Sequence, residues 1–177
     1  MSKVTDRMIA PNATDGEVTL GFSAAFAGAA AAFLLAWHAD LDLWRIVVVT
    51  VVAFDLFGGA VVNATSAAKC WYHRPGRHWP HHLGFVAIHL HPFILALVVP
   101  GFGWAAAAII YALILGGAVF VTFAPSLLQR PIAFCATAFS MVVVTSVQEL
   151  PHAVAWFAPV LLLKLLLAHL LPEEATR

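Results

Sequence analysis

The stretch Cys70-Trp-Tyr-His73-Arg-Pro-Gly-Arg-His78-Trp-Pro-His81-His82-Leu-Gly-Phe-Val-Ala-Ile-His89-Leu-His91-Pro92 is a histidine-rich, partly polar interruption of a strongly apolar chain. It holds six of the nine histidines of the sequence. Neutral imidazole is the commonest metal ligand in proteins, so a cluster of this kind at a membrane boundary is a candidate metal site.

The composition around this stretch is that of a membrane protein. Of the 177 residues, 62% are hydrophobic and 10% are charged, which is more apolar than a water-soluble domain of this length requires. A helix needs about 20 apolar residues to cross the hydrocarbon core. Six segments meet this length, at 18–37, 43–65, 83–99, 102–123, 132–148 and 152–170. The sequence therefore predicts an all-α, polytopic protein whose six transmembrane helices form one compact bundle over residues 18–171, with polar tails at 1–17 and 172–177.

The placement of Lys and Arg predicts the orientation, because cytoplasmic loops are enriched in them. Six spans put both termini and the loop 69–82 on the basic side, with Lys3, Arg7, Lys69, Arg74, Arg77, Arg130 and Arg177, and leave only Arg45 opposite. We expect a multi-pass protein of a bacterial-type inner membrane with both termini in the cytoplasm. Nine basic residues balance nine acidic ones, so no charge excess indicates a nucleic-acid partner.

Ionisable residues inside predicted spans are functional candidates, because a charge in the bilayer is costly. Asp55 lies in the middle of the second span, and Gly59 and Asn63 follow it at steps of four on the same helix face. Lys164 in the last span lies at a similar depth, within roughly 15 Å of the cytoplasmic edge. Two interpretations stay open for Asp55: a structural ion pair with Lys164 or a histidine, or a catalytic or ligand role shared with Asn63.

The third span carries its own signals. Pro80 fits the first turn of a helix, and Pro92 is expected to kink the span and free the backbone carbonyl of Ile88. His89 and His91 are two residues apart, or about 200° around a continuous helix, so they are predicted to face different ways. His82 and His89, seven residues apart, are the better pair for a common site.

The pattern His78-Trp-Pro-His81-His82, preceded by His73, resembles the histidine boxes of integral-membrane di-iron hydroxylases and desaturases. The resemblance covers about twenty residues. It implies iron ligands at His73, His78, His81 and His82, with His89, His91 and His169 as further ones, because clustered imidazoles with open coordination positions suit redox iron. Asp55 or Asn63 would then form hydrogen bonds to the ligating imidazoles and fix their tautomers.

The sequence thus predicts a metal-dependent membrane enzyme that acts on a lipid-soluble substrate at the cytoplasmic leaflet, with iron as its cofactor and zinc or haem as alternatives. Three other interpretations stay open. The loop histidines and arginines could contact anionic lipid headgroups without a metal. Asp55 and His91 could line the path of a small solute or ion carrier. The chain could also be a subunit of a larger membrane complex, as a homo- or hetero-oligomer.

Overall fold

The computed structural model describes residues 10–147 and 149–172. Every regular element in this part of the chain is helical. The elements are α2 (Asp15–His38), α3 (Leu43–Ala64), α4 (Ser66–Tyr72), α5 (Trp79–Ala87), α6 (His91–Val98), α7 (Trp104–Phe123), α8 (Ser126–Val147), the 3₁₀ turn η1 (His152–Val154), α9 (Phe157–Leu162) and the π-helix η2 (Leu163–His169).

Six helical stretches of the described chain are long and apolar enough to cross a membrane, which confirms the predicted number of candidate spans. They are Asp15–His38, Leu43–Ala64, Trp79–Val98, Trp104–Phe123, Ser126–Ser146 and His152–His169. Several predicted features lie outside the described residues, namely most of the tails 1–17 and 172–177, Gln148, and the basic residues Lys3, Arg7 and Arg177.

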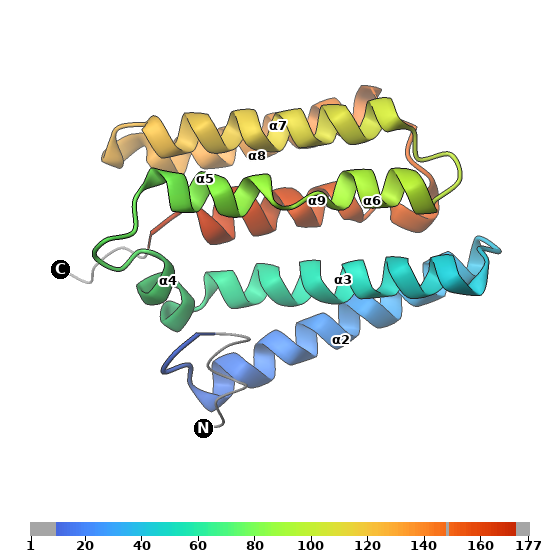
Figure 1. Ribbon diagram of the computed structural model, residues 1–177, viewed down its shortest axis with the longest axis horizontal. Coiled ribbons are helices and arrows are strands. Elements are labelled where there is room, and N and C mark those ends of the chain that lie inside the picture. Colours follow the sequence, from blue (N-terminus) through green and yellow to red (C-terminus); the bar gives the residue numbers. More distant parts are fainter. Residues whose placement is uncertain (1–9, 148, 173–177) are drawn as a thin grey trace.

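The six stretches lie roughly side by side in three tiers (Figure 1). One outer tier holds α2 and α3, the other holds α7 and α8, and α5, α6 and the last span lie between them. The last span is the central helix: 56% of its apolar window is buried, against at most 39% for the other five. A polar side chain on the last span is therefore surrounded mostly by other helices.

The pairing of α2 with α3 depends on small residues. A Cβ atom placed on Gly28 would lie 2.2 Å from the Phe57 ring, and one on Gly58 would lie 2.8 Å from the Ala25 side chain. Small residues at a helix interface let two backbones approach closely, which is how membrane helices associate without a hydrophobic driving force between them. The α2–α3 pair thus forms one wall of the bundle.

The start of α2 is fixed by a capping box. The Thr14 hydroxyl accepts a hydrogen bond from the Glu17 backbone N–H at 3.2 Å, and the Glu17 carboxylate accepts one from the Thr14 N–H at 2.8 Å. The helix therefore begins at Asp15, three residues before the predicted span and inside the segment that we expected to be a polar tail. A second Glu17 oxygen accepts from the Ala67 N–H at 3.2 Å, which ties this end of α2 to α4.

The third span is interrupted, as Pro92 predicted. Helix α5 begins at Trp79 with Pro80 in its first turn and ends at Ala87, and α6 restarts at His91 with Pro92 in its first turn. The Ile88 carbonyl, which we expected to be free, accepts from the Leu90 N–H at 2.8 Å. The carbonyl that accepts a hydrogen bond from another helix is that of Ala87, at 2.7 Å from the Tyr111 hydroxyl of α7. A neighbouring helix thus supplies a hydrogen bond to the backbone at the break.

The fifth span differs from the prediction. We expected this span to begin at residue 132, directly after Pro131, yet α8 begins at Ser126 and continues through Pro131. Proline lacks an N–H, but it sits in the second turn, where it removes one backbone hydrogen bond without ending the helix. The sequence boundary at 132 was therefore six residues late.

Candidate functional site

An ion pair joins the second and last spans in the middle of the bundle. Lys164 Nζ donates to Asp55 Oδ2 at 2.6 Å and also approaches the Asp55 backbone oxygen at 3.3 Å. The Lys164 side chain is only 4% exposed, whereas that of Asp55 is 51% exposed. The pairing that the sequence left open is therefore formed, and the carboxylate is its accessible half.

Gly59 makes this pair possible. A Cβ on Gly59 would lie 2.5 Å from Lys164 Cε and 2.7 Å from its Nζ, so any larger residue would displace the ammonium group. Gly59 follows Asp55 by one turn and therefore leaves open the space through which the lysine reaches the carboxylate.

His91 completes this group from α6. Its Nε2 lies 3.4 Å from Asp55 Oδ2, and its Nδ1 is buried without a hydrogen-bond partner among the described residues. The His89 and His91 ring centroids are only 5.4 Å apart. The continuous helix assumed in predicting that these two histidines face different ways is not present, because the chain is not helical between α5 and α6. The two rings nevertheless have different partners, the Phe85 backbone oxygen for His89 and Asp55 for His91.

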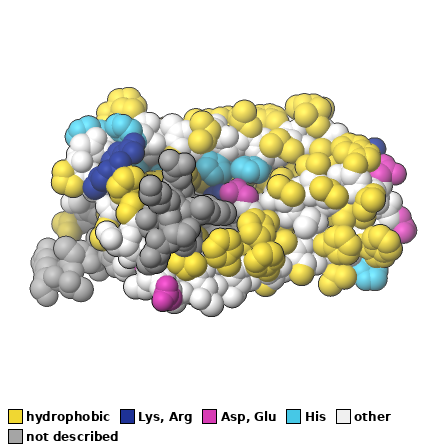
Figure 2. All heavy atoms as spheres, turned by 60° about the horizontal axis from the view of Figure 1, so that its bottom comes forward, with side chains coloured by type: hydrophobic (Ala, Val, Ile, Leu, Met, Phe, Trp, Pro, Cys, Tyr) yellow, Lys and Arg dark blue, Asp and Glu magenta, His cyan; other side chains and the backbone are white. Residues whose placement is uncertain are grey.

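A pocket of about 400 Å³ lies beside the ion pair, between α2, α3, α5 and the last span. Its polar lining comes from Asp55, Asn63, Tyr72, His89 and Lys164. The predicted stripe of Asp55, Gly59 and Asn63 is confirmed, since all three line it. The rest of the wall is apolar or small and includes Phe22, Phe54, Val62 and Phe85. Histidine and acidic side chains are visible together within a largely hydrophobic face of the molecule (Figure 2).

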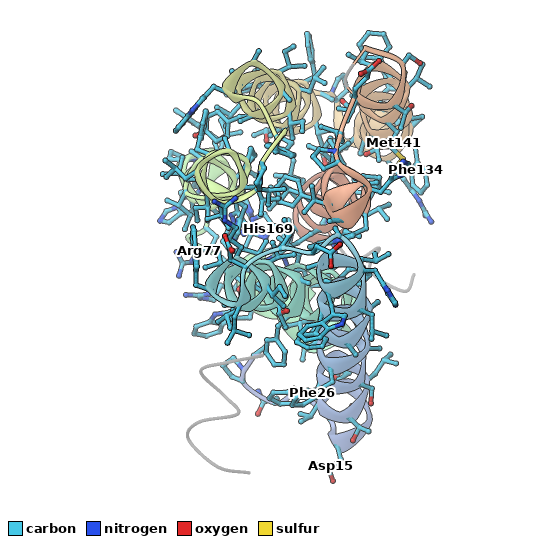
Figure 3. The ribbon with its side chains drawn as sticks, turned by 90° about the vertical axis from the view of Figure 1, so that its right-hand side faces the viewer. Asp15, Phe26, Arg77, Phe134, Met141 and His169 are labelled. Carbon is cyan, nitrogen blue, oxygen red and sulfur yellow. The ribbon has the colours of Figure 1, made fainter. Side chains whose placement is uncertain are left out.

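A second group of rings leads from the pocket toward the basic end of the bundle. His169 packs on the Phe85 ring at a centroid distance of 3.9 Å and lies 5.4 Å from His82, which stacks on His73 at 4.5 Å. His169 is 2% exposed, and neither of its ring nitrogens has a hydrogen-bond partner among the described residues. Figure 3 shows His169 inside the bundle, whereas Phe134 lies on the outer side of α8.

The π-helix η2 explains why the Lys164 and His169 side chains both extend from the last span toward α3, α4 and α5. Residues five apart on an α-helix point about 140° away from each other. The wider turn of a π-helix, with hydrogen bonds from residue i to i+5, brings such residues nearly into line, and π-turns are frequent at functional sites. Lys164 reaches α3, and His169 meets α4 and α5 through Tyr72 and Phe85.

Helix α4 closes this end of the bundle. The Lys69 ammonium donates to the backbone oxygens of Ala168 and Leu171, at the C-terminal end of the last span, where a cation is favoured. His73 Nε2 lies 3.0 Å from the His169 backbone oxygen. Burial lowers the pKa of His73 and raises that of Tyr72, so both side chains stay neutral near pH 7.

The structure divides the seven histidines that the sequence grouped as metal ligands. His73, His82 and His169 form the ring stack, and His89 and His91 adjoin the ion pair. His78 and His81 lie on the surface at the start of α5, where the His78 N–H donates to His81 Nδ1 at 3.3 Å. The pairing of His82 with His89 is not formed as a direct contact, since His82 meets His169 and His89 packs on Phe85.

Within residues 10–147 and 149–172, no three His, Cys, Asp or Glu side chains are arranged to hold one metal ion. Cys70 and Cys135 are exposed free thiols.

Two residues of the site were missed in the sequence. Tyr72 and Phe85 each contact His169, and both line the pocket. A signal existed for Phe85, which precedes His89 by four residues and therefore shares its helix face; its backbone oxygen lies 2.6 Å from His89 Nδ1. For Tyr72 the only signal in the sequence was its position next to His73.

The geometry is the only guide to what this site does, because no protein-family model matches the chain and no curated protein or solved structure is significantly similar to it.

Proposed function

We propose that this protein is a multi-pass enzyme of the inner membrane, with both termini in the cytoplasm, that takes a lipid-soluble substrate into the pocket beside Asp55 and transfers a proton to or from it. The observation that carries this proposal is a half-exposed carboxylate that lines a 400 Å³ pocket while it is bonded to a buried lysine. Ligand pockets generally combine apolar walls with a few polar groups that converge on one point.

The orientation is supported by the charges that the structure describes. Lys69, Arg74, Arg77 and Arg130 belong to the end of the bundle that carries α4 and the start of α8, whereas Arg45 belongs to the opposite end. Cytoplasmic loops are the ones enriched in Lys and Arg. The ring stack would then face the cytoplasm.

The roles follow from the contacts. Asp55 is the general acid or base, since its carboxylate is the accessible ionisable group in the pocket lining. Lys164 and His91 hold the carboxylate in place from two other elements. Asn63 lies two turns along the same helix and binds the substrate. A general acid or base of this kind contributes about 10²- to 10⁴-fold to a rate.

The test compares lipid extracts of cells that express the wild type, Asp55→Asn or the matched control Asp42→Asn. Asp42 lies at the other end of α3 and pairs with Arg45 at the surface, at 2.9 Å. We expect one lipid species to be depleted and another to accumulate with the wild type and the control, and neither change with Asp55→Asn. Identical extracts from all three strains would refute the proposal.

An iron site in the ring stack is a second candidate function, favoured by the two unpartnered nitrogens of buried His169. Its ligands would be His73, His82 and His169, whose rings would have to turn toward a common centre, because no three such side chains of the described chain are arranged to hold one ion. The measurement is the metal content of purified protein, with zinc and haem determined alongside iron. Iron that is retained in His152→Ala but lost in His82→Ala would support the site, and iron-free wild-type protein would reject it.

A further inference from the structure

The hydrogen-bonding groups that line the pocket beside Asp55 indicate which kind of headgroup a lipid-soluble substrate would carry. Asn63 is 4% exposed and lines the pocket, and its Nδ2 has no hydrogen-bond partner among the described residues. An amide nitrogen carries two N–H donors. A buried donor without a partner costs free energy, so a ligand oxygen that accepts from it would be bound favourably.

His89 supplies the complementary group. Its Nδ1 lies 2.6 Å from the Phe85 backbone oxygen, which only accepts hydrogen bonds, so Nδ1 carries the proton. In a neutral imidazole the other nitrogen, Nε2, is then an acceptor. His89 lines the same pocket as Asn63. We therefore take its Nε2 as the acceptor that a bound headgroup would use together with the Asn63 donor.

The charges of the pocket cancel. The Asp55 carboxylate and the Lys164 ammonium are bonded to each other at 2.6 Å and both line the pocket. An anionic headgroup would meet the carboxylate, and a cationic one would compete with the lysine for it. Burying a further charge without a partner is costly, so the pocket favours a neutral headgroup.

The rim of the pocket is apolar. Val51 lies one turn before Asp55 on α3, Phe26 packs edge-on against Phe54 of the pocket wall, and Ile88 precedes His89; all three are exposed on the bundle surface. In a bilayer such a rim faces lipid, so an apolar tail could leave the pocket sideways.

From these observations we infer that the pocket binds a long-chain alcohol, whose hydroxyl accepts from Asn63 Nδ2 and donates to His89 Nε2 while its tail extends past the apolar rim into the bilayer. A hydroxyl is the smallest neutral group that does both. This inference deepens the proposed function and rests on it for the chemistry, but the binding itself is measured separately.

The test is a set of four probes with one tail: farnesol, farnesoic acid, farnesylamine and farnesene. Each is titrated into the purified protein in nanodiscs, with empty nanodiscs subtracted. We expect farnesol to bind at least tenfold more tightly than the other three, and Asn63→Leu to weaken farnesol binding about tenfold or more. The matched control is Gln129→Leu, which removes an amide from α8, away from this pocket.

A second measurement does not depend on the folding of a variant. A farnesol analogue with a diazirine next to its hydroxyl is photo-cross-linked to the wild type, and the labelled peptides are identified by mass spectrometry. Labels on α3 or α5 support the inference, whereas labels confined to α7 and α8 overturn it. Equal affinity for farnesoic acid and farnesol, or farnesol binding that Asn63→Leu leaves unchanged, also overturns it.

The two proposals fail in different ways. Farnesol binding together with identical lipid extracts from wild type and Asp55→Asn would reject the enzyme and keep the binding site. Altered extracts without farnesol binding would keep the enzyme and reject the alcohol as its ligand class.

Discussion

Helices α8 and α3 carry polar side chains into apolar surroundings in two different ways. On α8 the Thr137 and Thr145 hydroxyls donate to backbone oxygens of their own helix, to Ala133 and Met141, each at 2.8 Å. On α3 the Asp55 carboxylate is paired with a lysine 109 residues later in the chain. A hydroxyl that donates within its own helix does not determine which helix packs beside it. A charge that is paired with a group on another helix fixes the positions of both helices.

The largest effect is expected from removing the charge on α3. Asp55→Leu leaves the ammonium of buried Lys164 unpaired, and loss of one partner of a buried ion pair costs about 3–5 kcal/mol. The double variant Asp55→Leu/Lys164→Met is expected to recover most of this loss, because it removes the unpaired charge. Reversible unfolding in mixed micelles measures both.

Asp42→Leu is the control for this experiment. It breaks only the exposed Asp42–Arg45 pair and is expected to cost about 0–1 kcal/mol. If Asp55→Leu proves no more destabilising than Asp42→Leu, the contrast between the two kinds of polar group is lost.

The next effect in size concerns the space around the lysine. Gly59→Ala places a Cβ 2.5 Å from Lys164 Cε, and overpacking of this kind costs about 1–3 kcal/mol. Gly116→Ala on α7 would meet no described atom within 4 Å, and alanine is favoured over glycine in a helix by roughly 0.5–1 kcal/mol. Thermal unfolding midpoints should therefore shift in opposite directions, and a stabilised Gly59→Ala would contradict the close approach.

A smaller loss is expected on α8. Thr137→Val keeps the shape of the side chain and removes its hydrogen bond to Ala133. Side-chain hydrogen bonds in membrane proteins average about 0.6 kcal/mol, so the variant should lose no more than about 1 kcal/mol in the same unfolding assay. A loss as large as that of Asp55→Leu would show that α8 is as dependent on its polar groups as α3.

The smallest effect is a dependence on pH at the basic end. Burial lowers the pKa of His73 below its ordinary value of 6.5. At pH values between the lowered pKa of His73 in the folded protein and the ordinary 6.5 of the unfolded chain, the unfolded chain binds more protons than the folded one. The free energy of unfolding therefore falls as the pH drops below about 6.5. His73→Gln should flatten the decrease of the unfolding midpoint between pH 7 and 5 relative to His38→Gln, whose histidine is exposed. An unchanged slope would mean that His73 is not the group responsible.

Most of the fold could be predicted from the sequence, because the length and hydropathy of a span are local properties. The boundaries at Leu43, Ala64, Val98 and Phe123 came within about one residue. Pro131 misled, because proline breaks the interior of most helices but is tolerated in long apolar ones, where neighbouring groups satisfy the freed backbone. The boundary error at α8 was therefore an error about how strongly proline ends a helix of this kind.

The candidate site could be predicted only in part. Asp55, Asn63 and Lys164 were identified because a polar residue in an apolar span is conspicuous. The arrangement of the histidines was not, because it depends on two departures from the regular α-helix, the break before His91 and the π-helix before His169. Helical periodicity presupposes a regular helix, so it cannot place side chains beyond such a departure.

The π-helix η2 has the effect of one extra residue in the last span. Leu161 and Leu162 before it and Leu165 and Leu166 within it remain buried, so the change of register does not disturb the packing. Because the wider turn absorbs one extra residue, deleting one residue between Leu165 and Ala168 would restore an ordinary helical stretch of 17 residues, still enough to cross a bilayer, and would leave His169 facing Phe85. The same residues wound as a regular α-helix without the deletion would instead turn His169 by about 100° away from Phe85. The position of this histidine thus depends on the match between the number of residues in the span and the width of its turns.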